Sequence, residues 1–176
     1  MTIAVEPQAP FQAQILLVDD DRDFRWATGN VLEMAGYAVV QVQNGEEALR
    51  FLKESVPDLV LLDFRMPGMD GLQLLKRVRH LSPNTAGIIL TGYATIENAV
   101  SSFQSGVRAF LRKPVDRMEL LGSVQSALRV QTLENENRGY REELERMVLA
   151  KSMQLRQALA ETRQAFEFAV DGFATL

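Results

Sequence analysis

The alternation of short apolar runs with helical patterns is the feature that most constrains how this chain folds. Between the runs, apolar residues return at the spacing of an amphipathic helix. The runs are residues 15–18, 39–42, 59–62, 88–90 and 107–111, and the helical patterns are residues 24–35, 46–53, 71–81 and 94–104. Such alternation favours parallel strands joined by helical crossovers. The sequence therefore predicts an α/β fold with a five-stranded parallel sheet, doubly wound, and helices on both faces.

Phe24 is an apolar position of the first helical pattern, which Gly36 is expected to end. The third helical pattern is expected to bury Leu72, Leu75 and Val78.

The third apolar run indicates where the chemistry of this sheet lies. Leu59–Leu62 is apolar without interruption, as in a strand buried on both faces, and it stops at Asp63. Pro67, Gly68 and Gly71 follow and predict a tight loop. Asp63 is therefore expected at the carboxyl end of a central strand, where open α/β sheets place their ligands. Taken alone, Asp63 fits a plain turn or cap residue equally well.

Polar side chains also follow other apolar runs. The acidic run Asp19–Asp21 ends the first, Thr91 ends the fourth, and Lys113 follows the fifth. The carboxyl ends of parallel strands share one edge of the sheet, so these side chains are expected to converge with Asp63.

Such a set of side chains suits a divalent cation and a phosphoryl group. Carboxylates brought together repel one another unless a cation lies between them, and oxygen ligands alone favour magnesium. The ammonium of Lys113 and the hydroxyl of Thr91 suit an anion with several oxygens. Asp63 is then the candidate nucleophile, because carboxylates can form acyl phosphates. The metal and Lys113 would offset the charge that develops during transfer.

With these motifs, residues 14–130 resemble the receiver domain of two-component response regulators, which has a flavodoxin-like fold. The matching segments are Leu17–Asp20, Leu62–Gly71, Leu90–Gly92 and Phe110–Pro114, in the family's order and spacing. The resemblance implies a phosphoprotein in which Asp63 accepts phosphate from a sensor histidine kinase. The receiver itself would catalyse this phosphorylation and the later dephosphorylation. No separate enzymatic output domain is expected within these residues.

The resemblance also implies a set of magnesium ligands. Asp19 and Asp20 would hold Mg²⁺, Asp20 directly, with Asp63 and the backbone carbonyl of Arg65 completing the protein ligands. The register within the acidic run stays open by one residue, and the end of the strand favours Asp19 and Asp20 over Asp21.

Further roles implied by the resemblance concern the phosphoryl group and the switch. Thr91 and Lys113 would contact the phosphoryl oxygens. Phe110 would be the switch aromatic that turns inward as Thr91 moves, and the alternative is a plain core phenylalanine. The Lys113–Pro114 bond is often cis in this family.

Two smaller interpretations concern single residues. Arg65 and Tyr93 lie two positions after Asp63 and Thr91 and are both large. Our hypothesis is that they shield the acyl phosphate from water. His80, the only histidine, is expected to be a solvated surface residue without a catalytic role.

Composition excludes several other classes of protein. The net charge of −4 argues against a general nucleic-acid or membrane-surface binder. The chain has no cysteine, which excludes disulfides and thiolate chemistry. Neither a signal peptide nor a membrane-spanning run is present, so a cytoplasmic protein is expected. The main rival is a receiver-like interaction domain that works without phosphorylation. A hydrolase with an Asp nucleophile would need a second acid–base residue near Asp63, and we find none.

The C-terminal third is expected to form an extended coiled-coil helix. Its apolar positions follow the alternating four-and-three spacing of a coiled coil, in two sets shifted by one residue, which resembles a stutter. The first set is Leu133, Asn137, Tyr140, Leu144 and Met147, and the second is Leu155, Leu159, Thr162, Phe166, Ala169 and Phe173. Opposite charges lie four residues apart at Glu134–Arg138, Glu142–Arg146 and Arg141–Glu145. Such a narrow apolar face predicts a parallel homodimer, and the alternative is a helix that folds back on its own receiver.

The domain organisation follows from these patterns. We expect a flexible tail over residues 1–13, a receiver over residues 14–130 and a coiled-coil signalling helix over residues 131–176, cut before an output domain. Residues 144–176 resemble the connectors that precede HD-GYP-type cyclic di-GMP phosphodiesterase domains, although coiled-coil linkers look alike across families. A kinase, phosphatase or guanylate cyclase module are the alternatives. Direct binding to nucleic acid or membrane is not expected, because no helix-turn-helix follows and the helix is not basic.

Overall fold

The computed structural model describes residues 13–92 and 106–173, without the side chains of residue 165 and residues 167–173. The chain divides into two compact units, Met1–Thr132 and Leu133–Leu176, which are described separately. The expected helix over residues 94–104, Tyr93 and nearly all of the expected tail lie outside the described residues.

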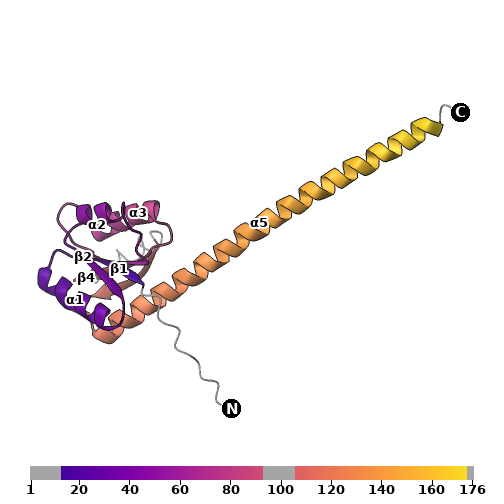
Figure 1. Cartoon of the computed structure of the whole chain (residues 1–176). Coiled ribbons are helices and arrows are strands. Elements are labelled where there is room, and N and C mark those ends of the chain that lie inside the picture. The colour runs from indigo at the N-terminus through magenta and orange to yellow at the C-terminus, as the bar shows by residue number, and fades with distance from the viewer. Residues whose placement is uncertain (1–12, 93–105, 174–176) are drawn as a thin grey trace, which may run out of the picture. The chain divides into compact units, whose positions relative to one another are not determined.

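The first unit is built on a parallel sheet of five strands in the order β2-β1-β3-β4-β5. Figure 1 shows this sheet with β1, β2 and β4 labelled. The strands are β1 (Gln14–Val18), β2 (Ala38–Val42), β3 (Leu59–Asp63), β4 (Ala86–Thr91) and β5 (Val107–Arg112). Every pair of neighbouring strands is parallel. The predicted doubly wound α/β fold is therefore confirmed. In this order the chain reverses its direction of winding between β1 and β3, which places the topological switch point there.

The central strand β3 explains why its sequence is an unbroken apolar run. All four residues from Leu59 to Leu62 are fully buried. Leu59 and Leu61 pack into the cluster on one face of the sheet, and Val60 and Leu62 pack into the cluster on the other. Side chains of a strand alternate between faces, so a strand covered on both sides needs an apolar residue at every position.

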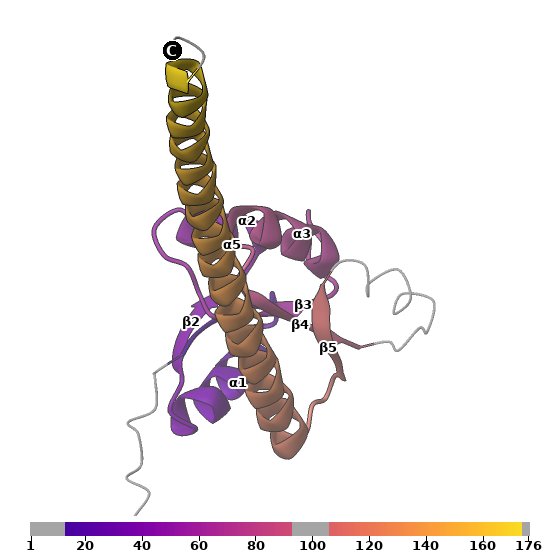
Figure 2. The same cartoon turned by 90° about the vertical axis from the view of Figure 1, so that its right-hand side faces the viewer.

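Helices cover both faces of this sheet. Helix α1 (Arg22–Met34) and the first turns of α5 (Arg117–Phe173) contribute Leu32, Leu120 and Val124 to one cluster. Helices α2 (Gly45–Phe51) and α3 (Gly71–Leu81) cover the other face, with α1 on the opposite side of the strands (Figure 2). Apolar surface buried in this way contributes about 25 cal/mol per Å² to folding.

Local signals fix where α1 begins and ends. The carboxylate of Asp21 accepts hydrogen bonds of 3.0 Å from the backbone N–H groups of Asp23 and Phe24, so Asp21 is the N-cap. At the other end Gly36 takes φ +93°, and its N–H donates to the carbonyl of Glu33 at 2.9 Å. Glycine adopts this left-handed conformation at little cost, which confirms Gly36 as the predicted stop.

Two details of the predicted helices were wrong. Helix α2 ends at Phe51 rather than Lys53, because Lys53 N–H bonds the carbonyl of Arg50, three residues back, and tightens the chain into turns. In α3, Leu74 is fully buried in place of Leu72, which is only partly buried. Together with Leu75 and Val78, Leu74 occupies the face that packs on the sheet.

The second unit consists of the remaining turns of α5, and its apolar side chains lie in solvent. Leu144 is 62% exposed, Leu155 64% and Phe166 72%. The charge spacing predicts that Arg146 pairs with the carboxylate of Glu142. The guanidinium of Arg146 instead lies 3.1 Å from the carboxylate of Glu143, while its Nε–H donates to the backbone carbonyl of Glu142. Among the described helices, none is both long and apolar enough to cross a membrane.

Candidate metal and phosphoacceptor site

The strand register brings the predicted acidic residues to one edge of the sheet. Val18 of β1 pairs with Leu62 of β3, so Asp19 and Asp63 follow at equivalent positions. Asp63 in turn pairs with Leu90 of β4. One carboxylate oxygen from each of Asp19, Asp20 and Asp63 lies within 4.8 Å of the others. The site therefore lies at the switch point between β1 and β3, where a doubly wound sheet opens to a ligand.

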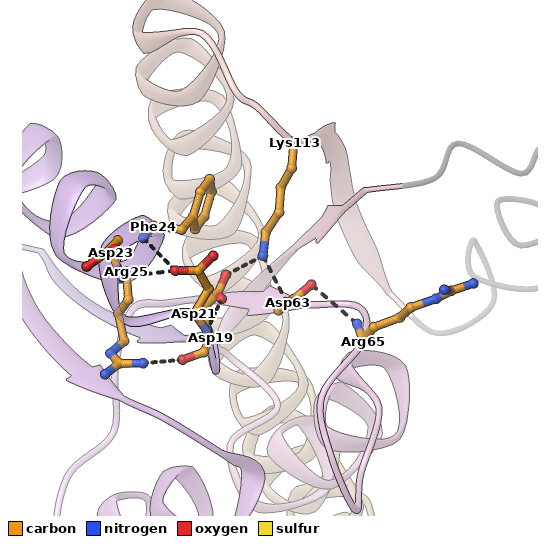
Figure 3. Close-up of polar contacts among 8 residues, drawn as sticks. All are labelled: Asp19, Asp21, Asp23, Phe24, Arg25, Asp63, Arg65 and Lys113. Atoms are coloured by element: carbon orange, nitrogen blue, oxygen red, sulfur yellow. Dashed lines mark hydrogen bonds and ion pairs between the residues drawn. The ribbon is translucent and has the colours of Figure 1, made fainter.

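Lys113 completes this site from the end of β5. Its Nζ lies 2.6 Å from Oδ2 of Asp19 and 2.9 Å from Oδ2 of Asp63 (Figure 3). The backbone N–H of Lys113 donates to the carbonyl of Thr91 at 2.8 Å, which ties the ends of β4 and β5 together. The lysine side chain is 19% exposed, so its ammonium reaches the carboxylates from a largely buried position.

Burial and charge shift the protonation of this group of residues. Burial raises the pKa of Asp19, and the nearby Asp63 carboxylate adds to the rise, while the hydrogen bond and charge of Lys113 oppose it. Burial by itself would lower the pKa of Lys113, but its hydrogen bonds to Asp19 and Asp63, reinforced by their charges, outweigh it and raise that pKa. Lys113 is therefore held firmly as a cation between two acids.

The donor set fits a magnesium ion. It offers only carboxylate oxygens, the ligands that this ion prefers. Oδ2 of Asp19 is buried and lies 2.6 Å from the ammonium of Lys113. A carboxylate oxygen has two lone pairs, so this contact leaves one of them for a metal ion.

The three residues of the acidic run, Asp19–Asp21, lie in two different environments. Asp19 is fully buried and Asp20 is exposed, and both contribute to the acidic group. Asp21 instead caps α1, and its hydrogen bonds from the N–H groups of Phe24 and Asp23 lower its pKa. This geometry places Asp19 and Asp20, rather than Asp21, with Asp63, which is the register that the sequence favoured.

Other predicted residues lie around this group. The backbone N–H of Arg65 donates to Oδ1 of Asp63 at 3.3 Å, and its side chain is exposed. Thr91 is the last residue of β4 and is half-buried. Phe110 lies on β5 and packs against the cluster beneath α2 and α3. The Lys113–Pro114 bond is cis, as the resemblance implied.

The remaining single-residue prediction concerns the only histidine. His80 lies near the end of α3 and is exposed, as expected.

Sequence reasoning missed two neighbours of the acidic group. The ring of Phe24 lies 4.3 Å from Nζ of Lys113, and the guanidinium of Arg25 donates to the backbone carbonyl of Asp19. The helical spacing predicts only that Phe24 is an apolar residue of helix α1. Recognising Asp21 as the N-cap would have placed both residues in the first turn of α1, beside the end of β1.

The order of the strands and the acidic edge define a class: a flavodoxin-like α/β protein with carboxylates and a lysine at its switch point. Within that class, the chain belongs to the response regulator receiver domain family, whose model matches residues 15–125. The resemblance of residues 14–130 to this family is confirmed. The chain contains a receiver domain of a two-component response regulator, and its last helix, α5, continues to Phe173.

Curated relatives agree with this family and are much longer. The chain is 40% identical over 114 residues to the DNA-binding transcriptional regulator NtrC of Escherichia coli K12, covering 65% of this chain and 24% of that regulator. It is 42% identical over 116 residues to the transcriptional regulatory protein GlrR of the same organism, covering 66% and 26%. The chain thus spans about a quarter of the length of these relatives.

Solved structures show the same fold. A CheY-like receiver domain protein from Methanospirillum hungatei is similar with a TM-score of 0.66 and 35% identity, covering 69% of this chain and 98% of that one. The receiver domain of an HD domain-containing protein from Pseudomonas fluorescens is similar with a TM-score of 0.65 and 30% identity, with the same coverage.

Proposed function

We propose that Asp63 accepts a phosphoryl group from a sensor histidine kinase in a magnesium-dependent reaction, and that this controls a dimeric helical linker. The observation that carries the proposal is the meeting of Asp19, Asp20 and Asp63 at one edge of the sheet with the ammonium of Lys113 against two of them. Nucleophile, acidic metal ligands and a fixed cation are the parts that phosphoryl transfer to a carboxylate requires.

Each residue has a defined task in this reaction. A carboxylate oxygen of Asp63 attacks phosphorus and forms the new P–O bond, while the P–N bond to the donor histidine breaks and its electron pair returns to that nitrogen. Asp19, Asp20, Asp63 and the carbonyl of Arg65 would hold magnesium, which supplies positive charge to the phosphoryl oxygens when bound. Lys113 neutralises charge on the same oxygens, because its ammonium already lies at the acceptor.

We propose that two residues respond to phosphorylation: Thr91 at the end of β4 and Phe110 within β5. Thr91 would hydrogen-bond the phosphoryl group, and Phe110 would turn inward as Thr91 moves. Support comes from the backbone: Leu90, directly before Thr91, pairs with Asp63, and Phe110 pairs with Ile89 on the neighbouring strand. A change at Asp63 therefore reaches β5 through adjacent residues of one sheet.

Incubation with acetyl phosphate and magnesium followed by intact-mass measurement tests the acceptor. The wild-type chain is expected to gain one phosphoryl group, and Asp63→Asn to gain none. Asp70→Asn is the matched control: Asp70 is the N-cap of α3, and asparagine caps a helix as well as aspartate does. This control should be phosphorylated like the wild type.

Two results would overturn the proposal. One is a mass gain that persists in Asp63→Asn, which would place the acceptor elsewhere. The other is a folded wild-type chain that gains no mass. That result would favour the alternative function, a receiver-like interaction domain that works without phosphorylation. Chelation of magnesium and the variant Asp20→Asn should each abolish or slow the reaction, since both remove the proposed cation.

The linker is proposed to act as a parallel homodimer through residues 131–176. The apolar positions predicted for its coiled-coil face are exposed in the single chain, among them Leu133 at 51% and Leu159 at 62%. A second copy of the same helix would bury them. Sedimentation equilibrium of the phosphorylated and unphosphorylated chain measures both the dimer and its coupling to Asp63.

In the whole protein, we propose that this linker controls an output domain, with an HD-GYP-type cyclic di-GMP phosphodiesterase as the candidate. Support comes from the resemblance of residues 144–176 to connectors of such proteins and from the similar receiver of an HD domain-containing protein. The curated relatives NtrC and GlrR are transcriptional regulators instead. Sequencing the reading frame beyond residue 176 and assaying cyclic di-GMP hydrolysis separates these outputs.

A further inference from the structure

The ammonium of Lys113 has a third neighbour besides the two carboxylates. Its Nζ lies 4.3 Å from the centroid of the Phe24 ring, within the range of a cation–π contact. In Figure 3 the ring lies beside the lysine chain, and the carboxylates of Asp19 and Asp63 lie below the ammonium. The cation is thus bounded by two acids and one aromatic ring.

The Phe24 ring is held in this place by contacts that do not involve Asp63. The backbone N–H of Phe24 donates to Oδ1 of Asp21 at 3.0 Å, which fixes the residue in the first turn of α1. Its side chain is partly buried and packs against the cluster that contains Leu17 and Leu120. The ring therefore has little freedom to follow a change at Asp63.

We infer that Phe24 is a positioning residue for Lys113, an inference that rests on the proposed acceptor role of Asp63. Phosphorylation converts the Asp63 carboxylate into an acyl phosphate and changes the partner of the ammonium. The negative face of the Phe24 ring does not change in that step, so it retains the ammonium at the sheet edge beside Asp19. An aliphatic side chain would fill the same space but offer no such face.

A double-mutant cycle on the unphosphorylated full chain tests the contact itself. The variants are Phe24→Leu, Lys113→Met and the two together, with unfolding by urea in the absence of magnesium. A cation–π contact predicts that Phe24→Leu lowers the folding equilibrium constant about two- to thirtyfold more in the wild-type background than in the Lys113→Met background. Equal losses in both backgrounds would mean that Phe24 acts only by packing, and would overturn the inference.

A series of fluorinated phenylalanines at position 24 tests the role in transfer. Successive fluorine atoms weaken the negative face of the ring and change its shape little. The rate of phosphorylation by acetyl phosphate is expected to fall stepwise along the series, about two- to thirtyfold in total, and the wild-type ring restores it. Equal rates along the series would overturn the positioning role.

The two experiments separate this inference from the proposed function. If the wild-type chain takes up no phosphate, the acceptor role fails while the cycle still reports the contact between Phe24 and Lys113. Phosphate uptake can instead be normal while the cycle shows no coupling and the fluorinated series shows no change in rate. The acceptor role then stands, and the inference about Phe24 fails.

Discussion

The two units of this chain use apolar side chains in opposite ways. In the first unit the large apolar residues of the central strand, such as Leu61, are fully buried between two layers of helices. In the second unit, residues of the same type lie on one helix and are more than half exposed, including Leu144 and Leu155. Apolar residues of one type are thus buried in the first unit and exposed in the second, because their arrangement along the chain differs.

This difference separates self-sufficient folding from folding that needs a partner. Strands with apolar residues on both faces can be covered by helices of the same chain, and the first unit does so. A coiled-coil stripe on a single helix has no second layer within its own unit, so its stabilisation must come from another helix. We therefore expect the first unit to carry the stability and the second to carry the association.

Ending the chain between the two units should have the largest effect on its self-association. A chain that ends at Thr132 retains Gln131, which is buried and accepts a hydrogen bond from Arg108 at 3.3 Å. It is expected to stay folded, to be phosphorylated at Asp63 and to be monomeric, whereas the 176-residue chain is expected to self-associate. Sedimentation equilibrium and circular dichroism measure this. A shortened chain that is unfolded or still dimeric would break the comparison.

A matched pair of leucine substitutions tests the comparison between the two units. Leu61→Ala removes a fully buried side chain and should lower the free energy of unfolding by about 2–5 kcal/mol. Leu155→Ala removes one that is 64% exposed and should leave the monomer's urea midpoint unchanged while weakening self-association. Urea titration at low protein concentration, paired with sedimentation at high concentration, reads the two effects separately. Similar losses of monomer stability would contradict the division of roles.

Replacement of two glycines by alanine is expected to change the free energy of unfolding in opposite directions. A Cβ at Gly71 would lie 2.3 Å from the backbone carbonyl oxygen of Asp63, so Gly71→Ala must displace the start of α3 from the acceptor strand. We expect a loss of about 1–3 kcal/mol and slower phosphorylation. Gly122 lies within α5 with no atom near its would-be Cβ, so Gly122→Ala should stabilise by about 1 kcal/mol. Urea midpoints compare them, and a neutral Gly71→Ala would show that the acceptor loop is not tightly packed.

The sheet could be predicted from the sequence because its determinants are local. An unbroken apolar run such as Leu59–Leu62 fixes a buried parallel strand, and parallel strands must bring their carboxyl ends to one edge. The convergence of Asp19, Asp63 and Lys113 follows from that rule without knowledge of any contact.

Features that depend on how helices rotate were not predictable in this way. The burial of Leu74 instead of Leu72 and the contact of Phe24 with Lys113 depend on which helical face meets the sheet. That face is set by capping at Asp21 and Asp70 together with packing, and periodicity alone leaves it open by a residue.

The smallest effect on stability is expected from single charged side chains, one in each unit. In the first unit the carboxylate of Glu47 accepts hydrogen bonds from the backbone N–H of Gln43 at 3.1 Å and from its side-chain amide at 2.7 Å. These bonds lower the pKa of Glu47 below its ordinary value of 4.5, with the backbone bond as the main cause. In the second unit Glu143, whose side chain is 59% exposed, pairs with Arg146, whereas Glu47 is partly buried.

The sign of the Glu47 effect follows from that lowered pKa. A carboxyl group whose pKa is lower in the folded chain stabilises it above the unfolded pKa, and this stabilisation is lost as the pH falls through the folded value. Glu47→Gln should therefore lower the urea midpoint slightly at about pH 7, and this difference should disappear as the pH falls through the lowered pKa of Glu47. Glu143→Gln, the control, should leave the midpoint of the first unit unchanged over the same pH range. A Glu47→Gln difference that does not decrease with pH would show that the carboxylate acts through its shape and not through its charge.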